Sequence, residues 1–359
     1  MTENRPLVVG CDDTVIEEIL RLAAAVGCDT ERAPDLVAAR GRWAHAPLVL
    51  LDEHVVRVEP ELPRRRGVFL VSKGPPAPET WQRAFEAGVE RVVTLPEGED
   101  GLIAELAEVV EGPGVEGGCV VGVLGGRGGA GASVLAASIG LTAAREGPAL
   151  LVDCDPLGGG IDLLLGAELD GGLRWPALRV GSGRVSMPAL HSALPERRHG
   201  DGRLSFISCD RESLGPTAQA VKAVVEAGRR SGRVVVCDLP RQLGAGAAAA
   251  ADQADLLVLV VPAEVRACLA AKCVLHRLGE REGRVRVVVR GPAPDGLDAE
   301  YVADVVGVPL IADMPAERGL AKALERGEFA PRPRGPLATA AQAVLTAARS
   351  GRSEAGAPR

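Results

Sequence analysis

The chain has 359 residues, of which 47% are hydrophobic and 25% are charged, and its formal net charge is −7. This length suits two ordinary domains, and this composition excludes a mainly disordered or collagen-like chain. The negative charge balance supplies no general attraction to nucleic acid, so DNA binding is disfavoured.

The first 110 residues alternate apolar segments with amphipathic ones. The expected strands are 6–10, 29–33, 47–53, 67–72 and 91–96, and the expected helices are 14–27, 35–44, 79–90 and 100–110. We interpret this alternation as five β/α pairs in a small parallel sheet with helices on both faces, because parallel strands require crossover connections. Residues 111–118, EGPGVEGG, are predicted to form a linker because of their Gly and Pro content.

From residue 119 the alternation resumes on a larger scale. The expected strands are 119–126, 148–155, 203–210, 233–240, 255–262, 284–291 and 309–315, with helices that include 215–230 and 265–280. Nearly continuous Val, Leu and Ile runs predict a mostly parallel sheet that is covered on both faces. The predicted fold class is therefore α/β, with two doubly wound domains: a small flavodoxin-like domain over 1–110 and a larger one over 119–349. Residues 350–359 are expected to form a disordered tail.

A glycine-rich loop, GGRGGAGAS at 125–133, lies between an apolar run and an Ala-rich stretch. Gly126, Gly131 and Ser133 fall where the phosphate-binding pattern G-x-x-x-x-G-K-[ST] requires them. Position 132 is alanine instead of lysine, and Arg127 is the cation of the loop. Backbone N–H groups at a helix N-terminus bind phosphate without any side chain, so the loop predicts a nucleotide site.

Three carboxylates follow predicted strands. Asp153 and Asp155 end the strand at 148–155, and Asp238 ends the strand at 233–240. Open α/β sheets bind ligands at this edge, where a carboxylate can hold a water on Mg²⁺ or orient a water towards a γ-phosphate. An Asp in this position can also cap the following helix.

Three segments resemble the MinD/ParA family of P-loop ATPases, whose deviant Walker A motif is K-G-G-x-G-K-[ST]. They are RGGAGAS (127–133), LVDCDPLGGGID (151–162) and VVVCDLPR (234–241), and the similarity extends over about 118–349. Arg and Ala at the two lysine positions resemble the CpaE/TadZ branch, which includes actinobacterial CpaE-like septum site-determining proteins. That branch has an atypical receiver domain ahead of the ATPase. The resemblance implies ATP or ADP with Mg²⁺ as the cofactor and a homodimer as the working form.

The resemblance also implies residue roles. Ser133 and Asp238 are the expected Mg²⁺ ligands, with Asp238 as the Walker B carboxylate. Asp155 is expected to orient the attacking water, with Asp153 in support. Arg127 replaces the lysine that reaches the partner's nucleotide across a dimer. The phosphate-binding segment comprises Gly126, Arg127, Gly128, Gly129, Ala130, Gly131, Ala132 and Ser133.

Ala132 removes the lysine that bridges the β- and γ-phosphates in relatives. A hydrogen bond to a charged group contributes about 1.5 to 3 kcal/mol, so its loss lowers affinity roughly ten- to a hundredfold. Hydrolysis is affected more, because the missing charge acts mostly on the transition state. We therefore expect weak nucleotide binding and weak hydrolysis at most.

Residues 84–96 resemble the receiver segment that usually ends in Lys-Pro, but Leu95 replaces the lysine. Asp52 matches the phosphoacceptor and Ser72 the hydroxyl on the next strand. The acidic pair, Asp12 and Asp13, is displaced along the chain. A phosphoryl site needs a cation and clustered carboxylates for Mg²⁺. The domain is therefore expected to have a structural or docking role.

The leading hypothesis is a nucleotide-responsive spatial regulator of a septum-site or Flp/Tad-pilus secretion assembly. One alternative is an active ATPase that drives cargo positioning, and another is a phosphorylation-controlled signalling protein. The sequence has no signal peptide and no apolar run of roughly 18 residues, so a cytoplasmic protein is expected, recruited by partners to the septum, pole or inner face of the membrane. The stretch 336–351 lacks the aromatic and cationic faces of an interfacial helix, so it is expected to pack on the ATPase domain and not on lipid. The eight cysteines include no C-x-x-C pair and are expected to be buried thiols rather than metal ligands.

Overall fold

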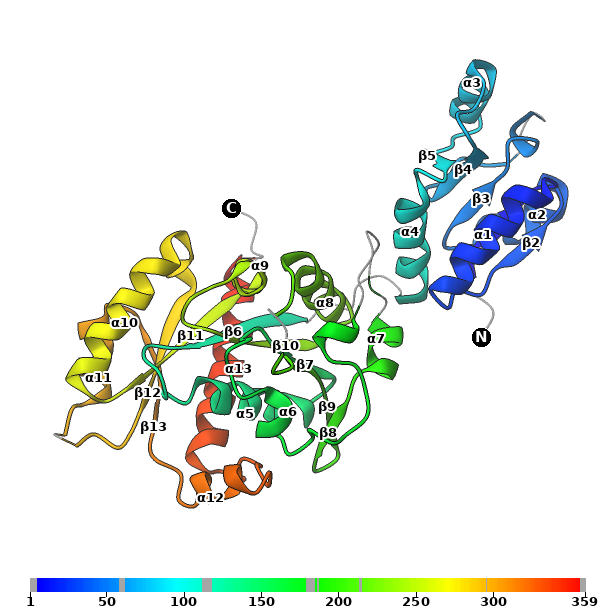
Figure 1. The fold of residues 1–359 in the computed structure, drawn as a ribbon. Helices are drawn as coiled ribbons and strands as arrows, with labels where there is room; N and C mark the ends of the chain where they lie inside the picture. Colours follow the sequence, from blue (N-terminus) through cyan, green and yellow to red (C-terminus); the bar gives the residue numbers. More distant parts are fainter. Residues whose placement is uncertain are drawn as a thin grey trace. The chain divides into compact units, whose positions relative to one another are not determined.

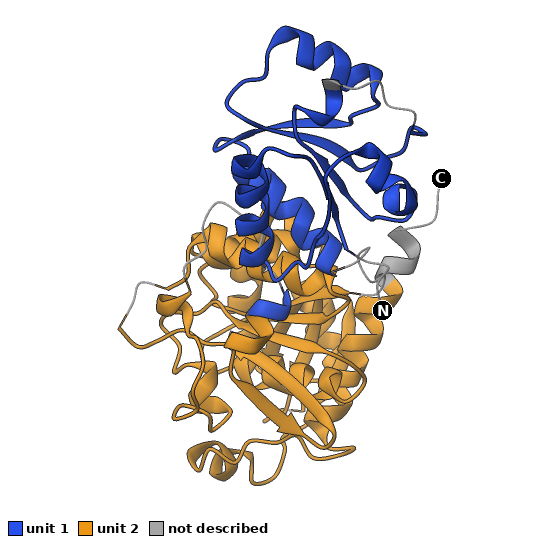
Figure 2. Cartoon of the chain, turned by 90° about the vertical axis from the view of Figure 1, so that its right-hand side faces the viewer, with its two compact units in different colours: residues 1–114, 181–189 blue, residues 115–180, 190–359 orange. Residues whose placement is uncertain are grey.

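The computed structural model describes residues 5–57, 62–111, 118–178, 185, 187–212, 215–294 and 296–355. The chain divides into two compact units, residues 1–114 with 181–189 and residues 115–180 with 190–359 (Figure 2). Each sheet lies within one unit. Most of the linker predicted at 111–118 falls outside the described residues.

The first unit holds a five-stranded parallel sheet in the order β2-β1-β3-β4-β5, the flavodoxin-like order that the sequence predicts. Its strands are β1 (Leu7–Val9), β2 (Glu31–Ala33), β3 (Val49–Leu51), β4 (Val68–Lys73) and β5 (Arg91–Leu95), and its helices are α1 (Asp13–Ala25), α2 (Leu36–Trp43), α3 (Pro78–Glu86) and α4 (Glu99–Glu111). Strand residues alternate between two apolar clusters, one shared with α1 and α4 and the other with α2 and α3. The interpretation as five β/α pairs is wrong in one place: among the described residues, only the short 3-10 helix η1 (Val55–Arg57) lies between β3 and β4.

The second sheet has eight strands in the order β13-β12-β11-β6-β10-β7-β9-β8 (Figure 1). They are β6 (Cys119–Gly125), β7 (Ala149–Asp153), β8 (Glu196–His199), β9 (Gly202–Ile207), β10 (Val234–Leu239), β11 (Leu256–Pro262), β12 (Val285–Arg290) and β13 (Leu310–Met314). All neighbours are parallel except β8 and β9. The sequence analysis missed β8 because this short edge strand, Glu-Arg-Arg-His, has no apolar residue.

The helices after residue 118 are α5 (Ala132–Ala144), α6 (Ile161–Leu164), α7 (Met187–Ala193), α8 (Ala218–Arg230), α9 (Ala245–Gln253), α10 (Val265–Leu278), α11 (Ala299–Val306), α12 (Leu320–Glu325) and α13 (Pro336–Ala355), with 3-10 helices η2 (Trp175–Ala177) and η3 (Gly279–Arg284). Helix α5 is apolar on all sides, as expected of a helix enclosed by its neighbours. It shares one apolar cluster with α13 and with residues of β6, β10 and β11.

Helix α13 packs on the second unit as predicted, with Leu337, Val344 and Leu345 fully buried in that cluster. It continues to Ala355, whereas the sequence predicted a disordered tail from residue 350. Residues 350–355 contain one glycine, Gly351, and no proline, and a single glycine costs a helix only about 1 kcal/mol. No helix in the described part of the chain is long and apolar enough to cross a membrane.

Two of the eight cysteines contradict the expectation of burial. Cys11 and Cys273 are exposed, and the other six are buried. All eight are free thiols.

Candidate functional site

The glycine loop joins β6 to the N-terminus of α5, as the sequence predicts. Gly129 and Gly131 have φ angles of 67° and 93°, which a residue with a side chain adopts only with strain. Gly131 is the N-cap of α5, and the N–H of Gly126 donates to the carbonyl of Val260 at 2.8 Å. The loop therefore ends at a helix N-terminus, where the positive end of the helix dipole favours an anion.

Ser133, in the first turn of α5, and Asp238, in β10, line one cavity, and the Ser133 side chain lowers the pKa of Asp238. Asp238 pairs in register with Asp153 on the neighbouring strand, so two carboxylates lie together at the carboxyl edge of the sheet. Burial raises the pKa of Asp238 well above its usual value, the charge of Asp153 raises it further, and the Ser133 side chain opposes the rise. A hydroxyl and a carboxylate are hard oxygen donors, and a divalent cation would relieve this crowding of negative charge, so the residues fit Mg²⁺. The three residues also line a common cavity of about 390 Å³.

Asp153 is a buried hydrogen-bond hub. Its Oδ1 accepts from the N–H of Asp155 at 3.0 Å. Its Oδ2 accepts from the N–H of Ile161 at 3.2 Å, the N–H of Cys209 at 3.0 Å and the hydroxyl of Ser208 at 3.1 Å. Burial raises the pKa of Asp153, and these hydrogen bonds lower it. Asp153 therefore fixes the loop that carries Asp155, which is consistent with the supporting role that the resemblance implies.

Asp155 lies on another side of the glycine loop. It is half-buried, and its Oδ1 accepts from the N–H of Leu157 at 3.0 Å. With Gly126, Gly128 and Arg241 it lines a cavity of about 720 Å³. This cavity and the one containing Ser133 are lined by different residues, so the structure distributes the predicted site residues over two hollows beside the loop.

Arg127 folds back onto its own chain. Its Nη2 donates to Oε1 of Glu264 at 2.8 Å, and its Nη1 donates to the carbonyl of Gly128 at 3.2 Å. Glu264 is the N-cap residue of α10, which follows β11. The sequence analysis missed Glu264 because no spacing rule connects it to a loop 137 positions earlier.

A second cation reaches the loop from the end of β12. Arg290 donates from Nη1 to the carbonyl of Gly129 at 3.2 Å, and its side chain passes beside Gly131, where an added Cβ would lie 3.6 Å from Nη1. Its Nε is buried and has no hydrogen-bond partner among the described residues. The sequence analysis did not single out this arginine, and its place at the carboxyl end of a strand was the available signal.

In the first unit both oxygens of the Asp52 carboxylate accept hydrogen bonds from the backbone. Its Oδ2 accepts from the N–H groups of Cys11 at 2.7 Å and Asp12 at 2.8 Å, and its Oδ1 accepts from that of Val55 at 2.9 Å. A Cβ on Gly10 would lie 2.4 Å from Oδ2, so this close approach requires glycine. The buried carboxylate is thus held in place by the backbone around it.

The other residues at receiver positions also make structural contacts within the domain. The Asp12 side chain caps α1 by accepting from backbone N–H groups of its first turn. The Ser72 hydroxyl donates to the carbonyl of Gly74 at 2.9 Å, and Leu95 is buried in the core. Sequence reasoning missed His54, whose ligand atom lies with those of Cys11 and Asp52 within 4.8 Å of one another.

The fold defines a class: a CheY-like domain followed by a domain with the MinD/ParA P-loop NTPase fold. Residues 9–117 match the family described as Rv3660c-like, CheY-like N-terminal domain. The chain is 44% identical to uncharacterized protein Rv3660c of Mycobacterium tuberculosis over 344 residues, which cover 93% of this chain and 95% of that protein. It belongs to the family of that protein.

Two further similarities concern the second domain. A putative septum site-determining protein MinD of Nephroselmis olivacea is 26% identical over 218 residues, covering 58% of this chain and 78% of that protein. The structure of the septum site-determining protein MinD of Pyrococcus horikoshii, complexed with Mg-ADP, superposes with a TM-score of 0.51 at 16% identity. It covers 67% of this chain and 98% of that one, and at this identity it shows the fold alone. The predicted receiver-plus-ATPase resemblance and fold class are thereby confirmed.

Proposed function

We propose that this protein is a nucleotide-responsive spatial regulator. It binds ATP with Mg²⁺, dimerises, and positions or regulates a septum-site or Flp/Tad-pilus assembly, with little or no hydrolysis. The observation that supports this best is that Ser133, Asp153 and Asp238 line one cavity beside a glycine loop at a helix N-terminus. A nucleotide phosphate fits the loop, and Mg²⁺ would be held by the side chains of Ser133 and Asp238.

Binding without the lysine at position 132 has a physical basis in Arg290. Its guanidinium already contacts the loop, and its buried Nε still lacks an acceptor among the described residues. A planar guanidinium suits phosphate oxygens, so Arg290 partly replaces the missing charge during binding. The replacement comes from another strand and not from the first turn of α5, so we do not expect it to restore the transition-state contact that lysine makes in relatives.

Dimerisation through Arg127 requires that it leave Glu264. The two side chains are 34% and 37% exposed, and ion pairs of this kind contribute only about 0 to 1 kcal/mol. One charge-assisted hydrogen bond to a partner's phosphate contributes about 1.5 to 3 kcal/mol, which exceeds that amount. The ion pair with Glu264 therefore holds Arg127 within the monomer, but it is weak enough to be replaced by a contact with the partner's phosphate.

Calorimetric titration with ATP and Mg²⁺, followed by a phosphate-release assay, tests the proposal. We expect measurable binding and no release above the rate of the Asp155→Ala variant. Steady release that depends on Asp155 would favour the active ATPase instead, a possibility that the position of Asp155 beside Gly126 and Gly128 supports. Absence of any nucleotide binding would overturn the proposal.

A further inference from the structure

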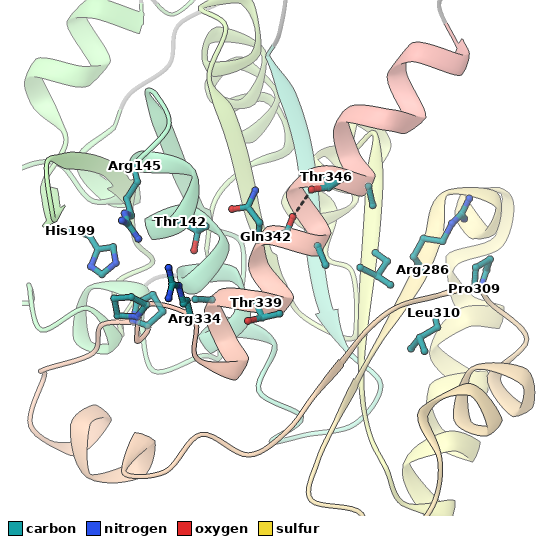
Figure 3. A pocket seen from close by; sticks show the side chains of 16 residues that line it. Thr142, Arg145, His199, Arg286, Pro309, Leu310, Arg334, Thr339, Gln342 and Thr346 are labelled. Atoms are coloured by element: carbon teal, nitrogen blue, oxygen red, sulfur yellow. Dashed lines mark hydrogen bonds between the residues drawn. The ribbon is translucent and has the colours of Figure 1, made fainter.

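A cavity of about 1160 Å³ lies at the end of α5 that is remote from the glycine loop. It extends along α13 to the start of β13 (Figure 3). Helix α5 has 13 residues, so about 20 Å separates the cavity from the loop at its other end. Nothing in the proposed nucleotide chemistry uses this cavity.

Three cationic or titratable side chains gather at one end of the cavity. Figure 3 shows Arg145, His199 and Arg334 there, with the Thr142 hydroxyl beside them. They come from three separate parts of the chain: the C-terminal end of α5, the last residue of β8, and the segment before α13. No lining residue in the described part of the chain is acidic, although Arg286 adds a further positive charge at the other end.

Three carboxylates close to these groups have other partners. Glu317, whose Oε2 lies beside Gly335, accepts from the N–H groups of Arg332 at 3.4 Å and Leu337 at 3.3 Å. Glu146, next to Arg145 in sequence, accepts from Arg349 at 2.6 Å. Glu196, on the same strand as His199, lies 3.3 Å from His191 and 3.7 Å from Arg203. Within the described residues, neither Arg145 nor Arg334 has an ion-pair partner. The positive charge of this end of the cavity is therefore not balanced by the fold.

The backbone at Arg334 is also unusual. Its φ of 60° lies in the left-handed region, which costs a residue with a side chain roughly 1 to 2 kcal/mol and costs glycine little. Gly335 directly follows, yet the arginine occupies the strained position. The Arg334 side chain is exposed, and backbone strain of this kind concentrates at functional sites.

The state of His199 agrees with an unbalanced positive field. Burial lowers the pKa of His199, and the charges of Arg145 and Arg197 lower it further. An anion bound among these groups would oppose the effect of both arginines. The pKa of His199 is therefore a local reporter of the cavity.

We propose that this end of the cavity, formed by Arg145, Arg334, His199 and Thr142, binds a phosphate-bearing anion. The two guanidinium groups contact the phosphate oxygens, for which their planar fork is suited, and the Thr142 hydroxyl and the His199 ring donate hydrogen bonds. The volume exceeds that of a single phosphate, so the rest of the ligand extends along α13. A free phosphorylated molecule and a phospholipid headgroup share this chemistry.

The first test follows His199 in the full-length protein by NMR, with its ring signal assigned by a His199→Gln variant among the five histidines. We expect pyrophosphate to raise the pKa of His199 by about one unit, since an opposite charge within contact distance favours the charged form. The readout is local to the cavity, and the shift itself is measured on the wild-type protein. An unchanged His199 pKa at saturating pyrophosphate would overturn the proposal.

The second test compares the double variant Arg145→Ala, Arg334→Ala with Arg266→Ala, which removes an exposed arginine of α10 outside the cavity. In the double variant, the pyrophosphate concentration that produces half of the shift in the His199 pKa should be at least about tenfold higher than in the wild type. The reason is that each charged hydrogen bond contributes about 1.5 to 3 kcal/mol. The control should behave as wild type. Equal titrations of all three proteins would show adventitious screening and no site.

Flotation with phosphatidylglycerol vesicles, with phosphatidylcholine vesicles as the control, distinguishes a phospholipid headgroup from a free phosphorylated molecule. Flotation that the double variant loses identifies a lipid headgroup, and a His199 shift without flotation identifies a free phosphorylated molecule. Absence of both contradicts the proposal. None of these outcomes depends on ATP binding at the glycine loop, so this proposal and the proposed function fail separately.

Discussion

Replacing Asp238 with asparagine should stabilise the protein in the absence of nucleotide. The wild-type carboxylate is buried beside Asp153, and both burial and that neighbouring charge raise its pKa. The asparagine side chain keeps the size of the aspartate and has a carbonyl oxygen that accepts hydrogen bonds, but it carries no charge. Burying an ion costs several kcal/mol, and asparagine avoids this cost. Its neutral hydrogen bonds are weaker by about 1 kcal/mol, so we expect the free energy of unfolding to rise by about 2 kcal/mol.

The gain should depend on pH in a defined direction. A carboxyl whose pKa is raised by folding contributes stability that is fully present below its unfolded value of 3.8 and is lost as pH rises through the folded pKa. The wild type therefore loses stability on this account as pH rises, and Asp238→Asn does not. The difference should be near zero at about pH 4 and largest above the folded pKa of Asp238.

Thermal unfolding followed by circular dichroism between pH 4 and 8 measures this difference. About 2 kcal/mol corresponds to an increase in Tm of roughly 4 to 8 °C for a domain of this size. Asp201→Asn, at an exposed turn, is the matched control and should leave Tm unchanged. ATP with Mg²⁺ should raise the Tm of the wild type and not that of Asp238→Asn. The reasoning is refuted if the variant is no more stable than wild type at neutral pH, or if its gain is the same at every pH.

Four further outcomes follow from the two domains. Ala132→Lys should tighten ATP binding about tenfold or more, because it adds one charged hydrogen bond. Equal affinities of the wild type and this variant in calorimetry would show that the loop does not bind phosphate. Arg290→Ala should weaken ATP binding by a similar factor, and Ala132→Lys should rescue it; an unchanged affinity would remove Arg290 from the site. Arg127→Ala should abolish dimer formation in sedimentation with ATP and Mg²⁺ while changing stability by less than about 1 kcal/mol, and identical sedimentation of both proteins with and without nucleotide would exclude a dimer latch. Asp52 should resist acetyl phosphate and beryllofluoride because its oxygens accept three backbone N–H groups and Leu95 supplies no cation, and a mass increase at Asp52 would contradict this.

The sequence by itself determined the local order of the site. A continuous apolar strand, a glycine loop and an Ala-rich helix specify backbone N–H groups at a helix N-terminus wherever the segment folds. Likewise, Asp153 and Asp238 had to lie along the same edge of the sheet, because parallel strands end on the same side, whereas the structure decided that their strands are neighbours. These features depend on residues close in sequence or on the common direction of the strands.

The tertiary structure alone decided which distant side chains reach the loop. Arg290 lies 161 positions from Gly129, and Glu264 lies 137 positions from Arg127. Both contacts arise because β11 and β12 lie next to one another and β11 pairs with β6, so that the residues ending these strands surround the loop that follows β6. Hydrophobic periodicity tells a strand from a helix but not its neighbours in the sheet, since strand order is set by how all the crossover helices pack together.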